Sequence, residues 1–186
     1  MNVQASRAAL AIILAALVPA CASAGRGVDA PVTGPQAAGV YERFRALEGD
    51  WTGKSTKGWT DTISFKNIAG GSAVLSTSFQ AHEDDTMVTL IHPDGERLLL
   101  THYCAAKNQP RLQASAVNGN EVTFTYLDAT NLPSRDTGHM DKVLVRFEDS
   151  THFTERWTWY QDGQESWMEE IRYERVKSVE ERSPGP

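Results

Sequence analysis

Residues 47–53 read Leu-Glu-Gly-Asp-Trp-Thr-Gly, and at this point the pattern of the chain changes from helical to extended. Gly49 has no Cβ, so it allows a tight backbone turn in front of the first strand. Trp51 follows two residues later and offers a large apolar body that can fill the floor of a barrel. A tryptophan plug at the start of a run of strands predicts a hollow fold, and a hollow fold predicts a ligand.

The apolar pattern around this stretch predicts one helix followed by a series of strands. Val40, Phe44 and Leu47 recur at helical spacing, which predicts a helix over residues 36–47. After the helix, short alternating runs lie between turn residues, as they do in antiparallel strands. We expect ten strands, near residues 50–56, 60–67, 72–80, 85–92, 97–104, 111–117, 121–128, 141–148, 152–160 and 165–175.

Three connections, at residues 93–95, 117–119 and 161–163, contain the hairpin dipeptides Asp-Gly or Asn-Gly. The apolar pattern fits three-residue loops, because a slip of one residue sends every side chain to the other face. The facing pairs are then Leu90 with Leu98, Ala114 with Val122, and Trp157 with Trp167. Consecutive hairpins favour a meander, and closure protects its edges. The predicted fold is all-β: an up-and-down antiparallel β-barrel of about ten strands with a short N-terminal helix.

The N-terminal residues 1–24 have the pattern of an export signal. Arg7 precedes an uninterrupted apolar run, and Ala-Ser-Ala at residues 22–24 fits a cleavage site. Residues 17–21 also fit a bacterial lipobox, in which Cys21 carries a lipid. The two alternatives predict a periplasmic or secreted protein, or a lipoprotein anchored to a membrane through Cys21.

The remaining 162 of the 186 residues have the length of a single domain. We expect residues 25–35 to form a flexible lead-in, residues 36–178 to form the barrel domain, and residues 179–186 to be a disordered tail. Without Arg7 the chain has 17 Lys and Arg residues against 24 Asp and Glu residues, and the basic ones are scattered. We expect no nucleic acid partner, because phosphate contacts need concentrated positive charge. The pattern leaves the oligomeric state open.

The helical lead-in, Gly49-x-Trp51 and the meander together resemble the calycin group, which includes lipocalins, fatty-acid-binding proteins and their bacterial relatives. The resemblance covers roughly residues 40–175. It implies a ligand-binding barrel in which an arginine of the last strand, Arg172 or Arg175, covers Trp51.

Residues 102–111 also resemble a motif of uncharacterised exported bacterial proteins, and this second resemblance implies no known activity. A related group of ten-stranded bacterial barrels binds haem through a histidine near the C-terminus. This chain has no histidine after His152, so haem binding does not transfer and we expect no cofactor.

Large aromatic side chains alternate along the last two predicted strands. Trp157, Trp159, Trp167 and Tyr173 share one strand face, and Trp51 closes the same interior. These residues either line a pocket for an apolar or aromatic ligand or simply pack the core.

Two carboxylates fall on the same face and directly oppose each other under the three-residue loop. If Glu155 and Glu169 both point inward, they must share a proton or hold a cation between them. A shared proton would make an acid/base site. The alternative is a bulge that turns one of them outward.

His102 and Cys104 alternate with Leu98 and Leu100, so we expect both to point inward. They are candidates for metal binding or nucleophilic catalysis, or they are simply buried and hydrogen bonded. No paired Cys/His motif completes a zinc site, so no metal is expected. The irregular residues 130–139 are either a lid or a surface loop.

Three functions follow from these features. The first is an exported barrel that binds a small, largely apolar ligand. The second is an enzyme that uses Glu155, Glu169 or His102 as an acid/base. The third is an envelope lipoprotein without a ligand. No common enzyme fingerprint is present in the sequence.

Overall fold

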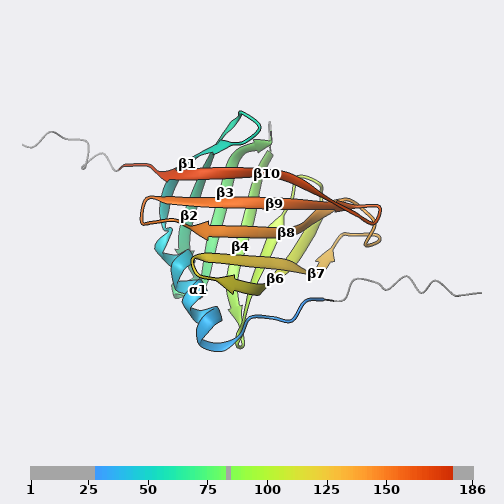
Figure 1. The fold of residues 1–186 in the computed structure, drawn as a ribbon, viewed down its shortest axis with the longest axis horizontal. Coiled ribbons are helices and arrows are strands. Elements are labelled where there is room, and N and C mark those ends of the chain that lie inside the picture. The colour runs from blue at the N-terminus through green and yellow to red at the C-terminus, as the bar shows by residue number, and fades with distance from the viewer. Residues whose placement is uncertain (1–27, 83–84, 178–186) are drawn as a thin grey trace, which may run out of the picture.

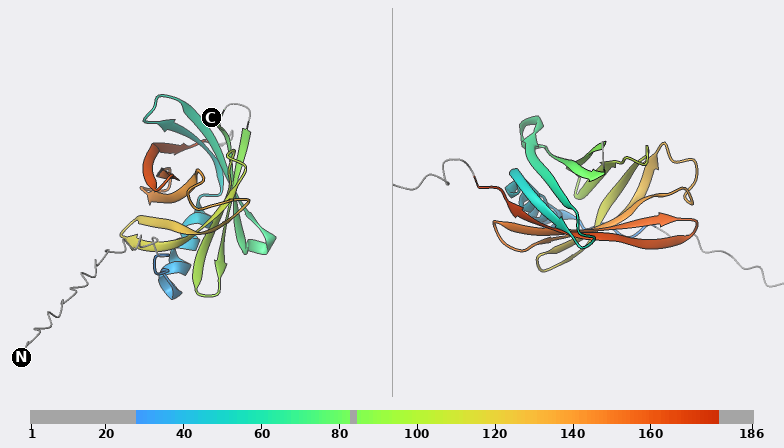
Figure 2. Two further views of the ribbon diagram at one scale, coloured as in Figure 1. Left: turned by 90° about the vertical axis from the view of Figure 1, so that its right-hand side faces the viewer. Right: turned by 90° about the horizontal axis from the view of Figure 1, so that it is seen from above.

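The computed structural model describes residues 28–82 and 85–177, in which ten antiparallel strands close into a barrel (Figure 1). Each strand pairs with its neighbours in the chain, and β1 pairs with β10 to complete the circle; Figure 2 shows the strands from two further sides. The predicted fold class is confirmed. The elements are α1 (Gly34–Ala46), β1 (Gly49–Ser55), β2 (Thr60–Ile68), a 3-10 turn η1 (Ala69–Gly71), β3 (Ala73–His82), β4 (Asp85–Asp94), β5 (Arg97–Tyr103), β6 (Gln109–Asn118), β7 (Glu121–Thr130), β8 (His139–Phe147), β9 (His152–Gln161) and β10 (Gln164–Arg175).

The predicted leader at residues 1–24 and the predicted tail at residues 179–186 lie outside the described residues. The described part of the lead-in runs along the barrel. The backbone N–H of Val32 donates to the carbonyl of Ala114 over 2.7 Å, and Val32 is buried. In the described part of the chain, neither α1 nor η1 is long and apolar enough to cross a membrane.

The three Asp-Gly and Asn-Gly hairpins have two-residue loops, so the predicted three-residue loops are wrong. The closing pairs are Asp94 with Arg97, Asn118 with Glu121, and Gln161 with Gln164. The first loop residue has a positive φ in each case: +60° at Gly95, +61° at Gly119 and +51° at Asp162. Two-residue loops of this kind match the twist of the strands that they join.

All three predicted facing pairs are wrong, the Leu90 pair because of its two-residue loop alone and the other two because bulges also shift the pairing. Ala114 faces Phe124 because the ladder slips after Ala114, and Trp157 faces Glu169 because it slips between Trp167 and Glu169. In β4 the inward residues are Met87, Thr89 and Ile91, while Leu90 pairs with Thr101. Both faces of β4 carry apolar residues, so alternation alone could not choose between them.

The floor of the barrel is built on Trp51, which is fully buried. Its indole N–H donates to the carbonyl of Leu47 over 2.8 Å. The Arg175 guanidinium lies 4.1 Å from the centre of the Trp51 ring and donates to the carbonyls of Glu48, Ala46 and Ser150. The predicted arginine cover is therefore Arg175. Arg172 points outward and binds the carboxylate of Glu148.

Helix α1 packs over the same end of the barrel, where it contacts β2, β4 and β5. Phe44 makes edge-to-face contacts with Phe124 and Phe147, at centroid distances of 5.8 and 5.1 Å. Between α1 and β1, Gly49 has a φ of +125°, and an added Cβ would lie 3.0 Å from a guanidinium nitrogen of Arg175. The glycine therefore allows both the turn and the arginine cover.

We predict that Arg175→Ala lowers the free energy of unfolding by about 2–3 kcal/mol, because it removes a cation–π contact and leaves three carbonyls without their charged donor. Arg172→Ala is the matched control on the same strand. Its exposed ion pair contributes no more than about 1 kcal/mol. Urea unfolding followed by tryptophan fluorescence measures both, and equal losses in the two variants would contradict this account of the floor.

Candidate functional site

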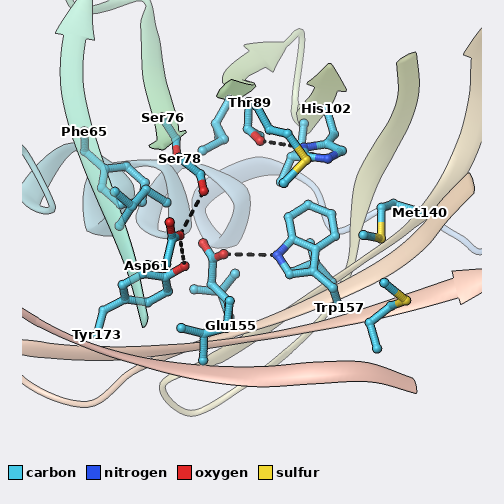
Figure 3. A pocket seen from close by; sticks show the side chains of 18 of the residues that line it. Asp61, Phe65, Ser76, Ser78, Thr89, His102, Met140, Glu155, Trp157 and Tyr173 are labelled. Carbon is cyan, nitrogen blue, oxygen red and sulfur yellow. Dashed lines mark hydrogen bonds between the residues drawn. The ribbon is translucent and has the colours of Figure 1, made fainter. Parts of the chain in front are cut away.

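The barrel interior is hollow above this floor (Figure 3). The gaps among its lining side chains and the open solvent at its mouth together amount to about 740 Å³. Most of the lining is apolar, from Phe44 of α1 to the aliphatic residues of β2, β4, β5, β8 and β10. Three of the four methionines of the chain, Met87, Met140 and Met168, also line it. The polar groups of the lining include two clusters, each centred on an acidic side chain.

The first polar cluster is centred on Asp61, which is fully buried on β2. The Tyr173 hydroxyl and the Ser78 hydroxyl each donate to its Oδ2, both over 2.9 Å (Figure 3). Tyr173 also stacks on Phe153 with ring centroids 4.6 Å apart. Burial, and then the charges of Glu155 and Asp61, raise the pKa of Tyr173 well above its ordinary value. The phenol therefore stays protonated and serves as a donor.

Gly53 leaves the space that Tyr173 needs. A Cβ on Gly53 would lie 2.5 Å from Cε1 of Tyr173 and 2.7 Å from Cγ2 of Ile171. No side chain fits at such distances without moving the ring. The last residue of the stretch at 47–53 thus positions the tyrosine that holds Asp61.

The second polar cluster is centred on Glu155, which is 8% exposed on β9. Its Oε2 accepts a hydrogen bond of 3.1 Å from the indole N–H of Trp157. Burial raises the pKa of Glu155 to about 7, the Trp157 hydrogen bond opposes that rise, and the charge of Asp61 adds to it. Figure 3 shows the Glu155 carboxyl between Asp61 and Trp157. A carboxyl with this pKa exchanges its proton near neutral pH.

His102 lies on the cavity wall, as expected. Its ring is buried, its Nδ1 lies 3.0 Å from Oγ1 of Thr89, and its centroid lies 4.8 Å from that of Trp157. Cys104 is not beside it, so the expectation of a shared inward face is wrong. β5 ends at Tyr103, and Cys104 begins the turn to β6, where its backbone N–H donates to the carbonyl of Asn108.

Glu169 also lines the cavity, but it does not oppose Glu155. Glu155 faces Ile171, and Glu169 faces Trp157, so the two carboxylates are diagonal neighbours. Oε2 of Glu169 accepts a hydrogen bond of 2.7 Å from the Ser55 hydroxyl. The predicted direct opposition is wrong because it relied on the three-residue loop.

Of the tryptophans expected inside, only Trp157 lines the cavity. Trp51 forms the floor beneath it, and Tyr173 lines it as expected. Trp159 does not line the cavity and packs on Gly138 instead. The contact is so close that a Cβ on Gly138 would lie 2.3 Å from the Trp159 indole. Trp167 is 55% exposed. The bulge between Trp167 and Glu169 brings Met168 to the cavity instead.

Asp61 and the methionines were not predicted as residues of the site. Asp61 alternates with Ile63 and Phe65 within a predicted strand, so an acid on an apolar face was the signal that could have found it. The methionines carry no such signal, because methionine is compatible with either side of a strand.

The loop between β7 and β8, considered as a lid, is held to the barrel by Arg135. The guanidinium lies between the rings of Tyr126 and Tyr160, 4.1 and 3.9 Å from their centroids. It also contacts His139 and Asp141, both buried. Burial lowers the pKa of His139. This network gives the loop a fixed attachment beside the barrel.

Comparisons with known proteins identify no relative by sequence: no protein-family model matches the chain, and no curated protein matches it. Two solved structures are similar in fold. One is a protein of unknown function from the DUF3598 family of Nostoc punctiforme, with 12% identity, a TM-score of 0.48 and coverage of 72% of this chain. This chain spans about half (49%) of that protein. The other is Rv2717c from M. tuberculosis, with 12% identity, a TM-score of 0.48 and coverage of 78% of this chain and 100% of that one.

We predict that Glu155→Gln stabilises the protein at high pH. Because the folded protein holds the Glu155 proton more tightly than the unfolded chain, wild-type stability falls as pH rises from about 4.5 to about 7 and stays low above that range. Glutamine still accepts from Trp157 but carries no charge. The variant should exceed the wild type by about 3 kcal/mol near pH 8 and lose that advantage by about pH 4. Urea unfolding across this range measures the difference, and a difference independent of pH would contradict it.

Proposed function

We propose that this protein is an exported, calycin-like barrel that binds a small, largely apolar molecule in its interior. The cavity carries the proposal. Sites for small molecules are concave and mostly apolar, with a few polar groups that fix the orientation of the ligand. Here Glu155, Asp61 and His102 are those polar groups, and they project from three different strands into a lining of aliphatic and aromatic side chains.

The three methionines support a binding role over simple core packing. Methionine is unbranched and polarisable, so it adapts to ligands of different shape. Met168 lies at the bulge of β10, and Met140 lies at the corresponding irregularity of β8. Both positions are on the β9 side of the cavity, beside Trp157. Such a wall can adjust to a bound ligand more readily than one of branched residues.

Export is the second part of the proposal, and it is supported by the sequence of residues 1–24. We place the mature protein in the periplasm or outside the cell. The alternative is a lipoprotein that is attached to a membrane through Cys21.

Acid/base catalysis is a second candidate function, favoured by the position and pKa of Glu155. A carboxyl with a pKa of about 7 in an apolar cavity can both accept and donate a proton at neutral pH. Proton NMR of a bound molecule distinguishes the two functions, because a binding protein returns its ligand unchanged.

For the binding function we predict that 2-phenylethanol, a slim and largely apolar probe, shifts the indole N–H resonance of Trp157 in ¹⁵N-labelled protein. Ser76→Leu should weaken this binding at least about tenfold, because the larger side chain occupies the cavity. Thr77→Leu is the control, since Thr77 is the next residue of β3 and lies outside the lining. Unaltered binding in the Ser76 variant, or no shift in the wild type, would contradict an interior site.

For export we predict that the protein recovered from the cell envelope or medium begins at Gly25. Intact mass spectrometry measures this directly. A mass that corresponds to a lipid on Cys21 would instead establish the anchored alternative, and an intact residue 1–24 segment would count against export altogether.

A further inference from the structure

Among the described residues, the carboxylates that line the cavity have no Lys or Arg beside them in the lining. Asp61, Glu155 and Glu169 all face the interior, and no Lys or Arg of the described residues contributes to its wall. Buried carboxylates are normally paired with a cation or hydrogen bonded on all sides. The three carboxylates differ in how far the protein itself meets this need.

Asp61 and Glu169 have hydroxyl partners that suit an anion. Two hydroxyls donate to the same oxygen of Asp61, and the Ser55 hydroxyl donates to Glu169. Glu155 has a single neutral donor, the Trp157 indole, and no ion-pair partner within the described residues. More than nine-tenths of this residue is buried, and its carboxyl group faces the cavity (Figure 3).

We propose that the ligand of this cavity is a small organic amine, bound as its protonated cation against the carboxylate of Glu155. The inference rests on the proposed function, since it names the chemical class of the ligand in the same interior site. An ammonium group supplies the charge that the wall lacks and donates to the carboxylate oxygen that Trp157 leaves open. The apolar remainder of the ligand lies against the aliphatic and methionine side chains.

The aromatic residues near Glu155 suit the same cation. Trp157, Tyr173 and Phe65 line the cavity on β9, β10 and β2, with Trp157 on one side of Glu155 and the other two rings on the opposite side (Figure 3). Aromatic faces attract ammonium groups, most strongly where water is excluded. A carboxylate flanked by aromatic rings therefore favours an organic cation over a neutral molecule of the same size.

A metal ion fits this site less well. Among the described residues, no group of three or more His, Cys, Asp or Glu side chains is arranged to hold one. Hard cations need several oxygen ligands and keep bound water, whereas this wall is mostly hydrocarbon. A protonated amine needs one carboxylate and an apolar surface, and both are present.

Binding of such a cation depends on pH because it requires ionised Glu155. The other titratable groups that face the cavity are Asp61, Glu169, Tyr173 and His102. Since the pKa of Glu155 is about 7, affinity for the amine should be constant above that pH and fall up to tenfold per unit below it. Glu155→Gln should remove the loss of affinity that protonation of Glu155 causes below this pH.

The test compares 2-phenylethylamine with 2-phenylethanol, which have nearly the same size and shape but differ in charge. Calorimetry near pH 8 should show at least about tenfold tighter binding of the amine to the wild type. Glu155→Gln should lose this preference while it retains the alcohol, which also shows that the variant is folded. The control Glu174→Gln, on the exposed face of β10, should keep the preference. Magnesium or calcium ions should not compete.

Each outcome decides between the two proposals. If both probes bind equally to the wild type, or if the preference survives in Glu155→Gln, the amine assignment is overturned and the binding function stands. If neither probe binds, both are overturned. Competition by magnesium or calcium would replace the amine with a metal ion.

Discussion

The guanidinium of Arg175 lies over the indole of Trp51 and joins the last strand of the barrel to the first. β1 and β10 meet only because the meander has curled through all ten strands, so this contact stands at the seam where closure is completed. A closed barrel has no unpaired strand edges. Its backbone hydrogen bonds are then satisfied within the wall, and the interior does not have to be filled for the fold to hold.

The floor that closes the barrel stabilises the folded protein, whereas the site above it destabilises the folded protein. The floor, formed by Trp51, Phe153 and α1, is aromatic, and both Trp51 and Phe153 are fully buried. The cavity above it contains Glu155, whose ionised form burial disfavours, as its raised pKa records. A carboxyl that opposes folding and has no ion-pair partner among the described residues is a feature of function more often than of packing. Along β9, Phe153 of the stabilising floor lies two residues before Glu155 of the destabilising site. Along β10, Arg175 of the floor lies two residues after Tyr173 of the site.

The sequence predicted the architecture well because its signals are local. Alternation of apolar residues, turn dipeptides and the Gly49-x-Trp51 spacing each depend on a few neighbouring residues, and together they gave the helix and the strands, whereas the arginine cover followed from the resemblance to calycins. The pairing of strands was predicted poorly. A bulge such as the one between Trp167 and Glu169 adds one residue to one strand, and no residue type announces it. That one residue decides whether Trp167 or Met168 reaches the cavity. His102 was predicted correctly because the β4–β5 ladder has no register shift, and Glu155 because it precedes the shifts in the ladders of β9. Asp61 was missed because a single acid in an apolar alternation has the pattern of an ordinary strand.

Residues 47–53 contribute both to the floor of the barrel and to the cavity above it, so their role is larger than that of a plug. Gly49 and Trp51 serve the floor, where the first allows the turn and the second accepts the arginine cover. Gly53 serves the site, because it makes room for the Tyr173 ring that donates to Asp61. The negative charge of Asp61 in turn adds to the pKa of Glu155. These interactions thus link Gly53, the last residue of this stretch, to Glu155, the carboxyl group most suited to a ligand. Closure of the barrel alone would tolerate a larger residue at position 53 together with a smaller ring at position 173. The pairing of Gly53 with Tyr173 is therefore explained by the cavity that the two residues shape.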